Sequence, residues 1–158
     1  MISILIPTYN YSILALIKKV HHQCLEAQIP FEIICLDDHS DNQYHIENQA
    51  ISTLSNCIYN VNQSNIGRTG TRQRLAEQAK YDWLLFLDAD VIPVSSVFIQ
   101  HYINVIQPNT VVFGGYRYEK KQPESSKILR YKYGKEREEK SAEFRSKKPY
   151  QYVFSGNM

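Results

Sequence analysis

The stretch WLLFLDADVIPVSS at residues 83–96 joins an uninterrupted apolar run to a pair of aspartates. Apolar residues at every position from 83 to 87 are typical of a strand that is covered on both faces of a sheet. Asp88 and Asp90 follow directly, and on extended chain their carboxylates point to the same side and repel each other. A bound cation would remove that repulsion, and oxygen ligands suit Mg²⁺ or Mn²⁺. The competing interpretation is a solvated turn whose aspartates cap the following helix.

The rest of the chain alternates between strand and helix patterns. Short apolar runs predict further strands at residues 2–6, 31–36, 56–61, 111–113 and 152–154. A stripe at helical spacing is formed by Ile13, Leu16, Ile17, Val20 and Cys24. Similar patterns predict helices over residues 67–80 and 99–106. Strands that are apolar throughout and separated by helices predict an α/β fold, a three-layer α/β/α sandwich with a mostly parallel central sheet.

Polar clusters follow three of the predicted strands. The clusters are PTYN at 7–10, DDHSDN at 37–42 and DAD at 88–90. In parallel α/β sheets, ligands bind outside the carboxyl ends of the strands. The three clusters are therefore expected to meet at one edge of the sheet.

Charge is distributed unevenly along the 158 residues, whose length suits one domain. The net charge is only +2, which argues against nucleic-acid binding by bulk charge. Residues 119–149 hold eleven Lys or Arg and six Glu, a surplus of +5, while the remainder carries −3. We expect 119–149 to be a basic, flexible insertion. The alternatives are a flap that closes on a substrate, or a patch that meets anionic lipid or phosphate.

Cysteine content and hydropathy bear on the compartment. Cys24, Cys35 and Cys57 lie in apolar surroundings without metal-binding spacing, which predicts buried, reduced thiols. No signal-peptide pattern is visible at the N-terminus, and no apolar run reaches the roughly 18 residues of a membrane span. The expected location is the cytoplasm, with peripheral contact at the cytoplasmic face of the membrane through the basic 119–149 segment.

Five motifs occur in the order and spacing of a known enzyme family. They are SILIPTYN at 3–10, LDDHS at 36–40, NIGRTGTRQ at 65–73, LFLDAD at 85–90 and FSGNM at 154–158. Together they resemble the family 2 glycosyltransferases, which have the GT-A (Rossmann-like) fold and use nucleotide-activated sugars. The resemblance covers essentially the whole chain.

The resemblance implies roles for individual residues. Pro7, Thr8 and Tyr9 match the loop that lies along the nucleoside, and Asp38 matches the residue that hydrogen-bonds the base. The segment beside the sugar diphosphate is matched by Asn65, Gly67 and Arg72. The sequence Asp88-Ala89-Asp90 matches the DxD motif, in which Asp90 is the expected direct ligand of Mn²⁺ or Mg²⁺ and Asp88 lies near the ribose or the metal.

The resemblance also implies a reaction. It is the inverting transfer of a sugar from a nucleotide-diphosphate donor, expected to be a UDP-sugar, to a glycan or lipid-linked acceptor in polysaccharide biosynthesis. The general base of the family lies beyond the FSGNM segment, so residues 1–158 are expected to be the nucleotide-sugar-binding part of a GT-A domain that is truncated at its C-terminal end. The alternatives are a nucleotidyltransferase and a non-catalytic nucleotide-sugar-binding module.

Some positions depart from the family pattern. Thr71-Arg72-Gln73 stands where the family has Ala-Arg-Asn, so only the arginine is kept. Arg68 and Arg74 add positive charge to the same segment and are candidates to share the contact with phosphate.

Overall fold

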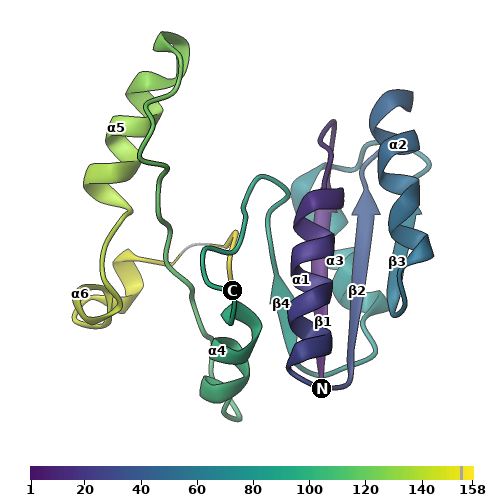
Figure 1. Cartoon of the computed structure of the whole chain (residues 1–158), viewed down its shortest axis with the longest axis horizontal. Coiled ribbons are helices and arrows are strands. Elements are labelled where there is room, and N and C mark those ends of the chain that lie inside the picture. The colour runs from purple at the N-terminus through teal and green to yellow at the C-terminus, as the bar shows by residue number, and fades with distance from the viewer. Residues whose placement is uncertain (154) are drawn as a thin grey trace.

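A four-stranded parallel sheet forms the centre of the computed structural model, which describes residues 1–153 and 155–158. The strands are β1 (Ile2–Thr8), β2 (Phe31–Asp37), β3 (Cys57–Val61) and β4 (Leu84–Phe86). Their spatial order is β3-β2-β1-β4 (Figure 1). The direction in which successive strands are added to the sheet reverses between β1 and β4. At such a point the loops that follow the two neighbouring strands diverge and leave a crevice.

The register of β1 and β2 fixes where their polar tails emerge. Ile2 pairs with Phe31 at one end, and Thr8 pairs with Asp37 at the other. The two strands therefore finish side by side, and the loops that begin at Tyr9 and Asp38 leave the sheet at the same edge.

Helices cover both faces of the sheet, which confirms the predicted three-layer α/β fold. One face is covered by α1 (Leu14–Glu26), the 3₁₀ turn η1 (Ala50–Thr53) and α4 (Phe98–Val105), with α2 (Asn42–Gln49) following β2 along the chain. The opposite face is covered by α3 (Gly67–Gln78) (Figure 1). Alternate residues of β1, β2 and β4 enter the two cores: Ile4 and Ile6 pack under α1, whereas Leu5 packs against Leu75 of α3. The predicted stripe of α1 is buried throughout.

The C-terminal residues lie beside β4. The Phe86 N–H donates to the Met158 carbonyl at 2.6 Å, and Leu87 and Asn157 form an antiparallel bridge. The Asp88 N–H donates to the Gly156 carbonyl at 2.9 Å. The end of the chain is thereby attached to the strand that carries the aspartate pair.

Two predicted strands are wrong. Residues 111–113 form no strand, because the segment 156–158 already occupies the free edge of β4 and only the Gly114 N–H reaches it, at 2.9 Å from the Asn157 carbonyl. Tyr152 and Val153 are also outside any strand, and the predicted end of that strand, Phe154, lies outside the described residues.

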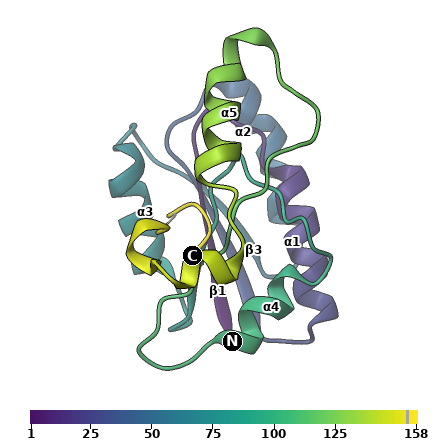
Figure 2. The same cartoon turned by 90° about the vertical axis from the view of Figure 1, so that its left-hand side faces the viewer.

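Residues 119–149 lie largely in an arm that stands beside the sheet domain (Figures 1 and 2). The arm contains η2 (Ser125–Lys127), α5 (Ile128–Arg137), α6 (Ala142–Ser146) and η3 (Pro149–Gln151). Helix α5 packs on Tyr118, whose ring meets Tyr131 edge-on at 6.1 Å and lies against Gly134. Arg145 of α6 donates to the carbonyls of Phe113 and Gly114, both at 3.2 Å.

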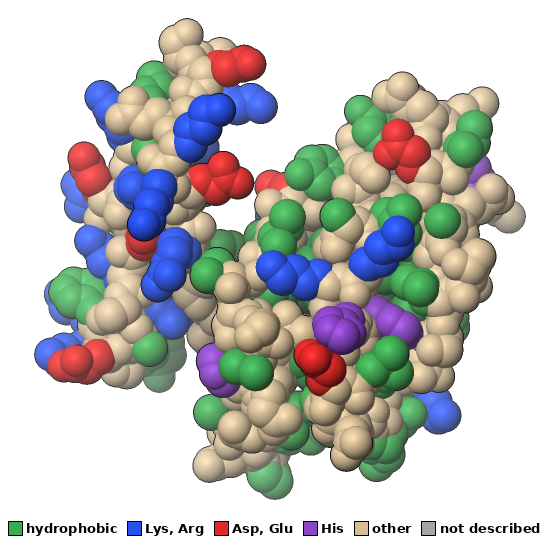
Figure 3. Space-filling view, in the orientation of Figure 1, with side chains coloured by type: hydrophobic (Ala, Val, Ile, Leu, Met, Phe, Trp, Pro, Cys, Tyr) green, Lys and Arg blue, Asp and Glu red, His purple; other side chains and the backbone are tan. Residues whose placement is uncertain are grey.

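Lys and Arg side chains are prominent on the arm in the space-filling view (Figure 3). None of the helices in the described part of the chain is both long enough and apolar enough to cross a membrane.

Candidate functional site

A cleft of about 470 Å³ lies at the carboxyl ends of β1, β2 and β4, next to the start of α3. Its lining comprises Pro7, Thr8, Tyr9, Tyr11, Asp38, Asn65, Gly67, Arg68, Thr71, Asp88, Ala89 and Asp90. Every site residue that the sequence singles out is in this set except Arg72 and Arg74. The three polar clusters therefore share one hollow, as the sheet topology requires.

Asp38 joins the end of β2 to the beginning of α3. Its Oδ1 accepts from the Asn62 side chain and from the Ile66 N–H, both at 2.9 Å, and its Oδ2 accepts from the Gly67 N–H at 2.8 Å. Burial acts to raise the pKa of Asp38, but these hydrogen bonds and one from Thr71 outweigh it, and the pKa lies below its usual value. The carboxylate thus remains ionised at the N-terminus of α3, where a negative charge is favourable.

Gly67 allows this connection. Its φ of +77° lies in the left-handed region, where a residue with a Cβ is strained. That conformation aims the Gly67 N–H at Asp38 and also places it 3.1 Å from Asn65 Oδ1. The N-x-G pattern at 65–67 is therefore a local turn whose amide groups face the cleft.

Asp37, next to Asp38, has a structural role, as its burial shows. It is fully buried and accepts from the Ser40 N–H at 2.7 Å and from the Tyr59 hydroxyl. Burial, followed by the hydrogen bond to Asp37, raises the pKa of Tyr59, which therefore stays a donor. Asp37 fixes the loop that presents Asp38.

Two tyrosines stand at the mouth of the cleft. Tyr9 and Tyr11 are 55% and 46% exposed, so their ring faces are available to a ligand. The Thr8 hydroxyl donates to the Tyr11 carbonyl at 3.1 Å, and the Asn10 N–H donates to Ser40 Oγ at 2.8 Å. The first bond closes the loop after β1 on itself, and the second ties that loop to the loop after β2. Tyr11 was not among the predicted residues, although the Tyr-Asn-Tyr sequence at 9–11 was available as a signal.

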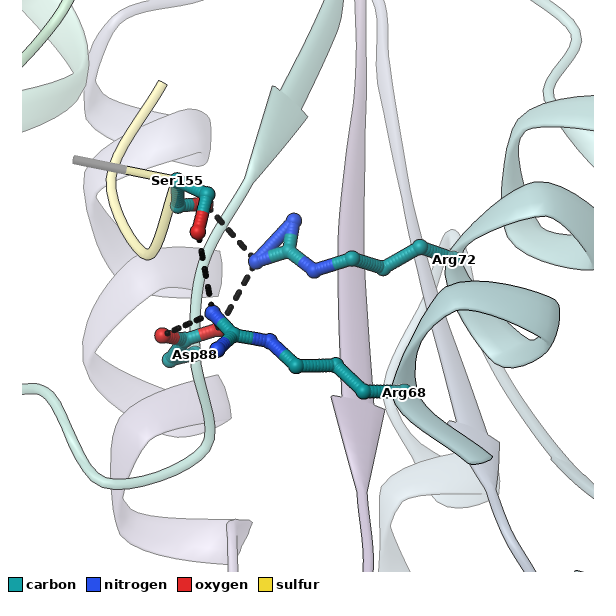
Figure 4. A network of polar contacts seen from close by, with 4 residues as sticks. All are labelled: Arg68, Arg72, Asp88 and Ser155. Atoms are coloured by element: carbon teal, nitrogen blue, oxygen red, sulfur yellow. Dashed lines mark hydrogen bonds and ion pairs between the residues drawn. The ribbon is translucent and has the colours of Figure 1, made fainter. Parts of the chain in front are cut away.

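Asp88 is held by two arginines of α3 (Figure 4). Arg72 Nη2 donates to Asp88 Oδ1 at 2.7 Å, and Arg68 Nη2 lies 3.1 Å from Asp88 Oδ2. Both guanidinium groups also reach Ser155 of the C-terminal segment: Arg68 contacts its hydroxyl at 3.0 Å and Arg72 its carbonyl at 2.7 Å (Figure 4). Arg74, the third arginine of the helix, instead donates to Asn62 Oδ1 at 2.8 Å and takes no part in this network.

Asp90 completes the acidic part of the cleft. It is exposed, and among the described residues it makes no hydrogen bond or ion pair. No group of three or more His, Cys, Asp or Glu side chains with metal-binding geometry occurs in residues 1–153 and 155–158. Two carboxylates in an open cleft nevertheless suit Mg²⁺ or Mn²⁺, because these ions commonly take one or two carboxylates and complete their coordination with phosphate oxygens and water.

Tyr116 is a neighbour of the aspartates that the sequence did not indicate. Burial, followed by the negative charges of Asp88 and Asp90, raises the pKa of its hydroxyl. Gly156 is the reason that Tyr116 and Asp88 can lie so close, since a Cβ at position 156 would collide with the Tyr116 hydroxyl and with Asp88 Oδ2. Tyr116 is 28 residues after Asp88 in the chain, so only the fold brings them together.

A second hollow, of about 260 Å³, lies along β4 on the side away from the cleft. Its lining is mainly apolar, including Ile2, Trp83, Leu85 and Ile106, and Asp82 is its only charged residue. A lining of this mainly apolar character is poorly suited to a charged ligand.

Comparison with known proteins identifies the family and the fold. The model of the family Glycosyl transferase family 2 matches residues 3–157. No curated protein sequence matches the chain. Solved structures with the same fold include S. aureus TarS 1–349 in complex with UDP, at 23% identity and a TM-score of 0.55, with 65% of this chain and 31% of that chain covered.

Two further structures come from other organisms. The mannosyltransferase PcManGT from Pyrobaculum calidifontis, in complex with GDP-Man and Mn²⁺, is 15% identical with a TM-score of 0.55, over 68% of this chain and 32% of that chain. Mannosyl-3-phosphoglycerate synthase from Rubrobacter xylanophilus is 16% identical with a TM-score of 0.53, over 65% and 35%. This chain thus spans about a third of the length of these structures. With the family model matched from residue 3 to residue 157 and the GT-A fold of these structures, the chain belongs to glycosyl transferase family 2.

Proposed function

We propose that the cleft binds a nucleotide-diphosphate sugar and that the protein transfers the sugar to a hydroxyl group of a glycan or lipid-linked acceptor, with inversion at the anomeric carbon. The observation that carries the proposal is the convergence of Tyr9, Asp38, Asp88 and Asp90 on one cleft in a chain of this family. That set combines a flat aromatic surface for a base with acidic groups from the ends of two different strands, β2 and β4.

The nucleoside end of the donor is assigned to the loops after β1 and β2. Tyr9 and Tyr11 supply ring faces, and Asp38 is an ionised acceptor whose hydrogen bonds to α3 hold it still. A fixed carboxylate at this place favours a base with an N–H on its pairing edge, and uracil carries one. We propose a UDP-sugar as the donor.

The diphosphate end is assigned to the aspartate pair and the arginines of α3. Asp90, with Asp88, would hold Mn²⁺ or Mg²⁺, and the bound ion would act as a Lewis acid that stabilises charge on the departing nucleoside diphosphate. The chain's own contribution is to place both carboxylates just beyond the end of β4 and to pair Asp88 with two arginines. No described residue is assigned as the general base.

The basic arm is assigned to an anionic surface. Residues 119–149 carry a surplus of +5, and Leu129 and Tyr133 are 80% and 58% exposed on α5. Positive side chains with exposed apolar ones beside them are suited to the cytoplasmic leaflet, which is negatively charged. We propose a cytoplasmic protein that meets the membrane through this arm, and co-sedimentation with phosphatidylserine vesicles, against phosphatidylcholine vesicles as control, tests it.

Thermal unfolding in the presence of nucleotide sugars tests the donor site. The chain would be heated with UDP-, GDP- and dTDP-linked sugars, each with and without Mn²⁺. A ligand at a hundredfold excess over its Kd raises the midpoint of a domain of this size by roughly 5–10 °C. Asp90→Asn should remove the metal-dependent part of the shift, whereas Asp82→Asn, an exposed acid outside the cleft, should leave it unchanged. Absence of a shift with every nucleotide, or a metal effect that survives in Asp90→Asn, would contradict the proposal.

A further inference from the structure

The two arginines that hold Asp88 differ in their surroundings. The side chain of Arg72 is 14% exposed and that of Arg68 is 62% exposed. Arg68 lines the cleft, and Arg72 does not. Residues four apart on a helix share a face, so both guanidinium groups come from the same side of α3 (Figure 4).

Arg72 is fixed on three sides. Its guanidinium lies 4.8 Å from the centre of the Phe86 ring, and the same group donates at 2.7 Å both to Asp88 Oδ1 and to the Ser155 carbonyl. The Arg72 Nε is buried and has no hydrogen-bond partner among the described residues. The guanidinium is packed against the Phe86 ring at this place. Moving Arg72 into the cleft would leave Asp88 without its short ion pair and the Ser155 carbonyl without this donor.

Arg68 is held loosely. Its contacts with Asp88 are 3.1 and 3.3 Å long, and its contact with the Ser155 hydroxyl is 3.0 Å long. Exposed ion pairs contribute little to stability because water solvates both partners. The Arg68 guanidinium can therefore leave the Asp88 carboxylate and bind a phosphate oxygen at a small cost in free energy. It already borders the cleft beside Asp88 and Asp90.

We propose that Arg68, rather than Arg72, is the cation that binds the diphosphate of the donor, and that Arg72 is a positioning residue that holds Asp88 and the C-terminal segment in place. This assignment rests on the proposed function. In the ligand-free chain the Arg68 guanidinium is hydrogen-bonded to Asp88 and to the Ser155 hydroxyl. When a diphosphate enters, its oxygens take the guanidinium, while the bonds of Arg72 keep Asp88 and residues 155–158 where they are.

Isothermal titration separates the two arginines. The chain would be titrated with UDP, GDP and dTDP, and with the corresponding nucleosides, all in Mg²⁺. Arg68→Ala should weaken binding of the nucleotide by about 10- to 100-fold, the usual effect of losing charge-assisted hydrogen bonds, and leave the nucleoside unaffected. The nucleotide affinity of Arg68→Lys should lie between those of the unmodified chain and Arg68→Ala, since an ammonium group keeps the charge but lacks the paired N–H donors of a guanidinium. Lys19→Ala, an exposed residue of α1, removes the same charge elsewhere and should bind as the unmodified chain does.

Arg72 has a different expected signature. Arg72→Met keeps an apolar side chain over Phe86 but loses the bonds to Asp88 and Ser155. It should lower the unfolding midpoint and, well below that midpoint, reduce the dependence of nucleotide affinity on Mg²⁺, because Asp88 is no longer oriented. Arg72→Lys should restore part of that metal dependence.

The outcomes are distinguishable. If no nucleotide binds to the unmodified chain, the proposed function fails and this assignment fails with it. If a nucleotide binds and Arg68→Ala binds it as tightly as Lys19→Ala does, only the assignment of Arg68 is overturned. Equal weakening of nucleotide and nucleoside by Arg68→Ala would also overturn it, because the loss would not depend on phosphate.

Discussion

The Asp38 carboxylate accepts a hydrogen bond from the backbone N–H of Gly67 at 2.8 Å, so the residue that follows β2 and the first residue of α3 are joined by a charged hydrogen bond. A second bond, from the Ile66 N–H at 2.9 Å, reinforces it. The side chain that we assign to the base of the nucleotide therefore also holds the helix that carries Arg68 and Arg72. Substitutions at Asp38 will affect both stability and binding, and the two effects need separate measurements.

Acid titration should reveal the structural part of this role. The pKa of Asp38 is lowered by folding from an ordinary value of 3.8, so its contribution to stability is complete above about pH 4 and is lost as the pH falls toward the folded pKa. Asp38→Asn should lower the free energy of unfolding by about 1–2 kcal/mol at pH 7 and flatten its dependence on pH below 4. Urea unfolding at several pH values measures both, with Asp82→Asn as the control. An unchanged slope in Asp38→Asn would show that another carboxyl is responsible.

Substitution of Gly156 should displace Asp88, although Gly156 itself does not line the cleft. A Cβ in Gly156→Ala would meet the Tyr116 hydroxyl and Asp88 Oδ2, so Asp88 must move. We expect weaker nucleotide binding and a smaller effect of Mn²⁺, measured by thermal shift. Adding Tyr116→Phe removes one of the two collisions and should recover part of the loss. If Gly156→Ala binds as the unmodified chain does, the contact with the C-terminal segment is not needed to place Asp88.

Arg145→Ala should free the arm. Arg145 of α6 donates to the carbonyls of Phe113 and Gly114, and these bonds join the arm to the segment beside β4. We expect faster cleavage by trypsin within residues 119–149 with little change in the unfolding midpoint of the sheet domain. Lys147→Ala is the control, since the Lys147 side chain is exposed and, among the described residues, pairs only with Glu143. Equal cleavage rates in the two variants would show that other contacts hold the arm.

The cysteines should be inert in the folded chain. Burial raises the pKa of Cys24 to about 12 and that of Cys57 to about 11, and it also raises the pKa of the fully buried Cys35. Since the thiolate is the reactive form, Ellman's reagent at pH 8 should react with none of them on a timescale of minutes. All should react after unfolding in guanidinium chloride. Rapid reaction of one thiol would most directly implicate Cys57, which is only partly buried.

The layers and the cleft were predictable because they depend on local patterns. Mainly apolar runs predicted β1 and β2, and the stripe from Ile13 to Cys24 predicted α1. Parallel strands bring their polar tails to one edge of the sheet whatever the loops between them do. The strand predicted at residues 111–113 was wrong for a physical reason. Its apolar residues are suited to a strand, but the free edge of β4 is taken by residues 156–158, which no local pattern indicates.

Details of the site were beyond the sequence because they depend on distant contacts. Arg68 and Arg72 are both arginines on one face of α3, and only the position of Phe86 and of the C-terminal segment makes one buried and the other accessible. Tyr116 reaches the aspartates because Asn157 binds the Gly114-Gly115 backbone and draws that segment toward β4. Side-chain contacts of this kind, between residues that only the fold brings together, leave no periodic signal in the chain.

The pairing of Thr8 with Asp37 at the ends of β1 and β2 has a consequence for tolerated changes in length. Neighbouring residues at the end of a strand face opposite ways, so Asp37 points into the interior beside Tyr59 and Asp38 points to the cleft. Deleting or inserting a single residue within β2 would exchange the two acids and turn the strand's apolar faces over, whereas an insertion in the exposed turn at 27–30 leaves that parity intact. Natural length variation in this region should therefore be confined to the turn.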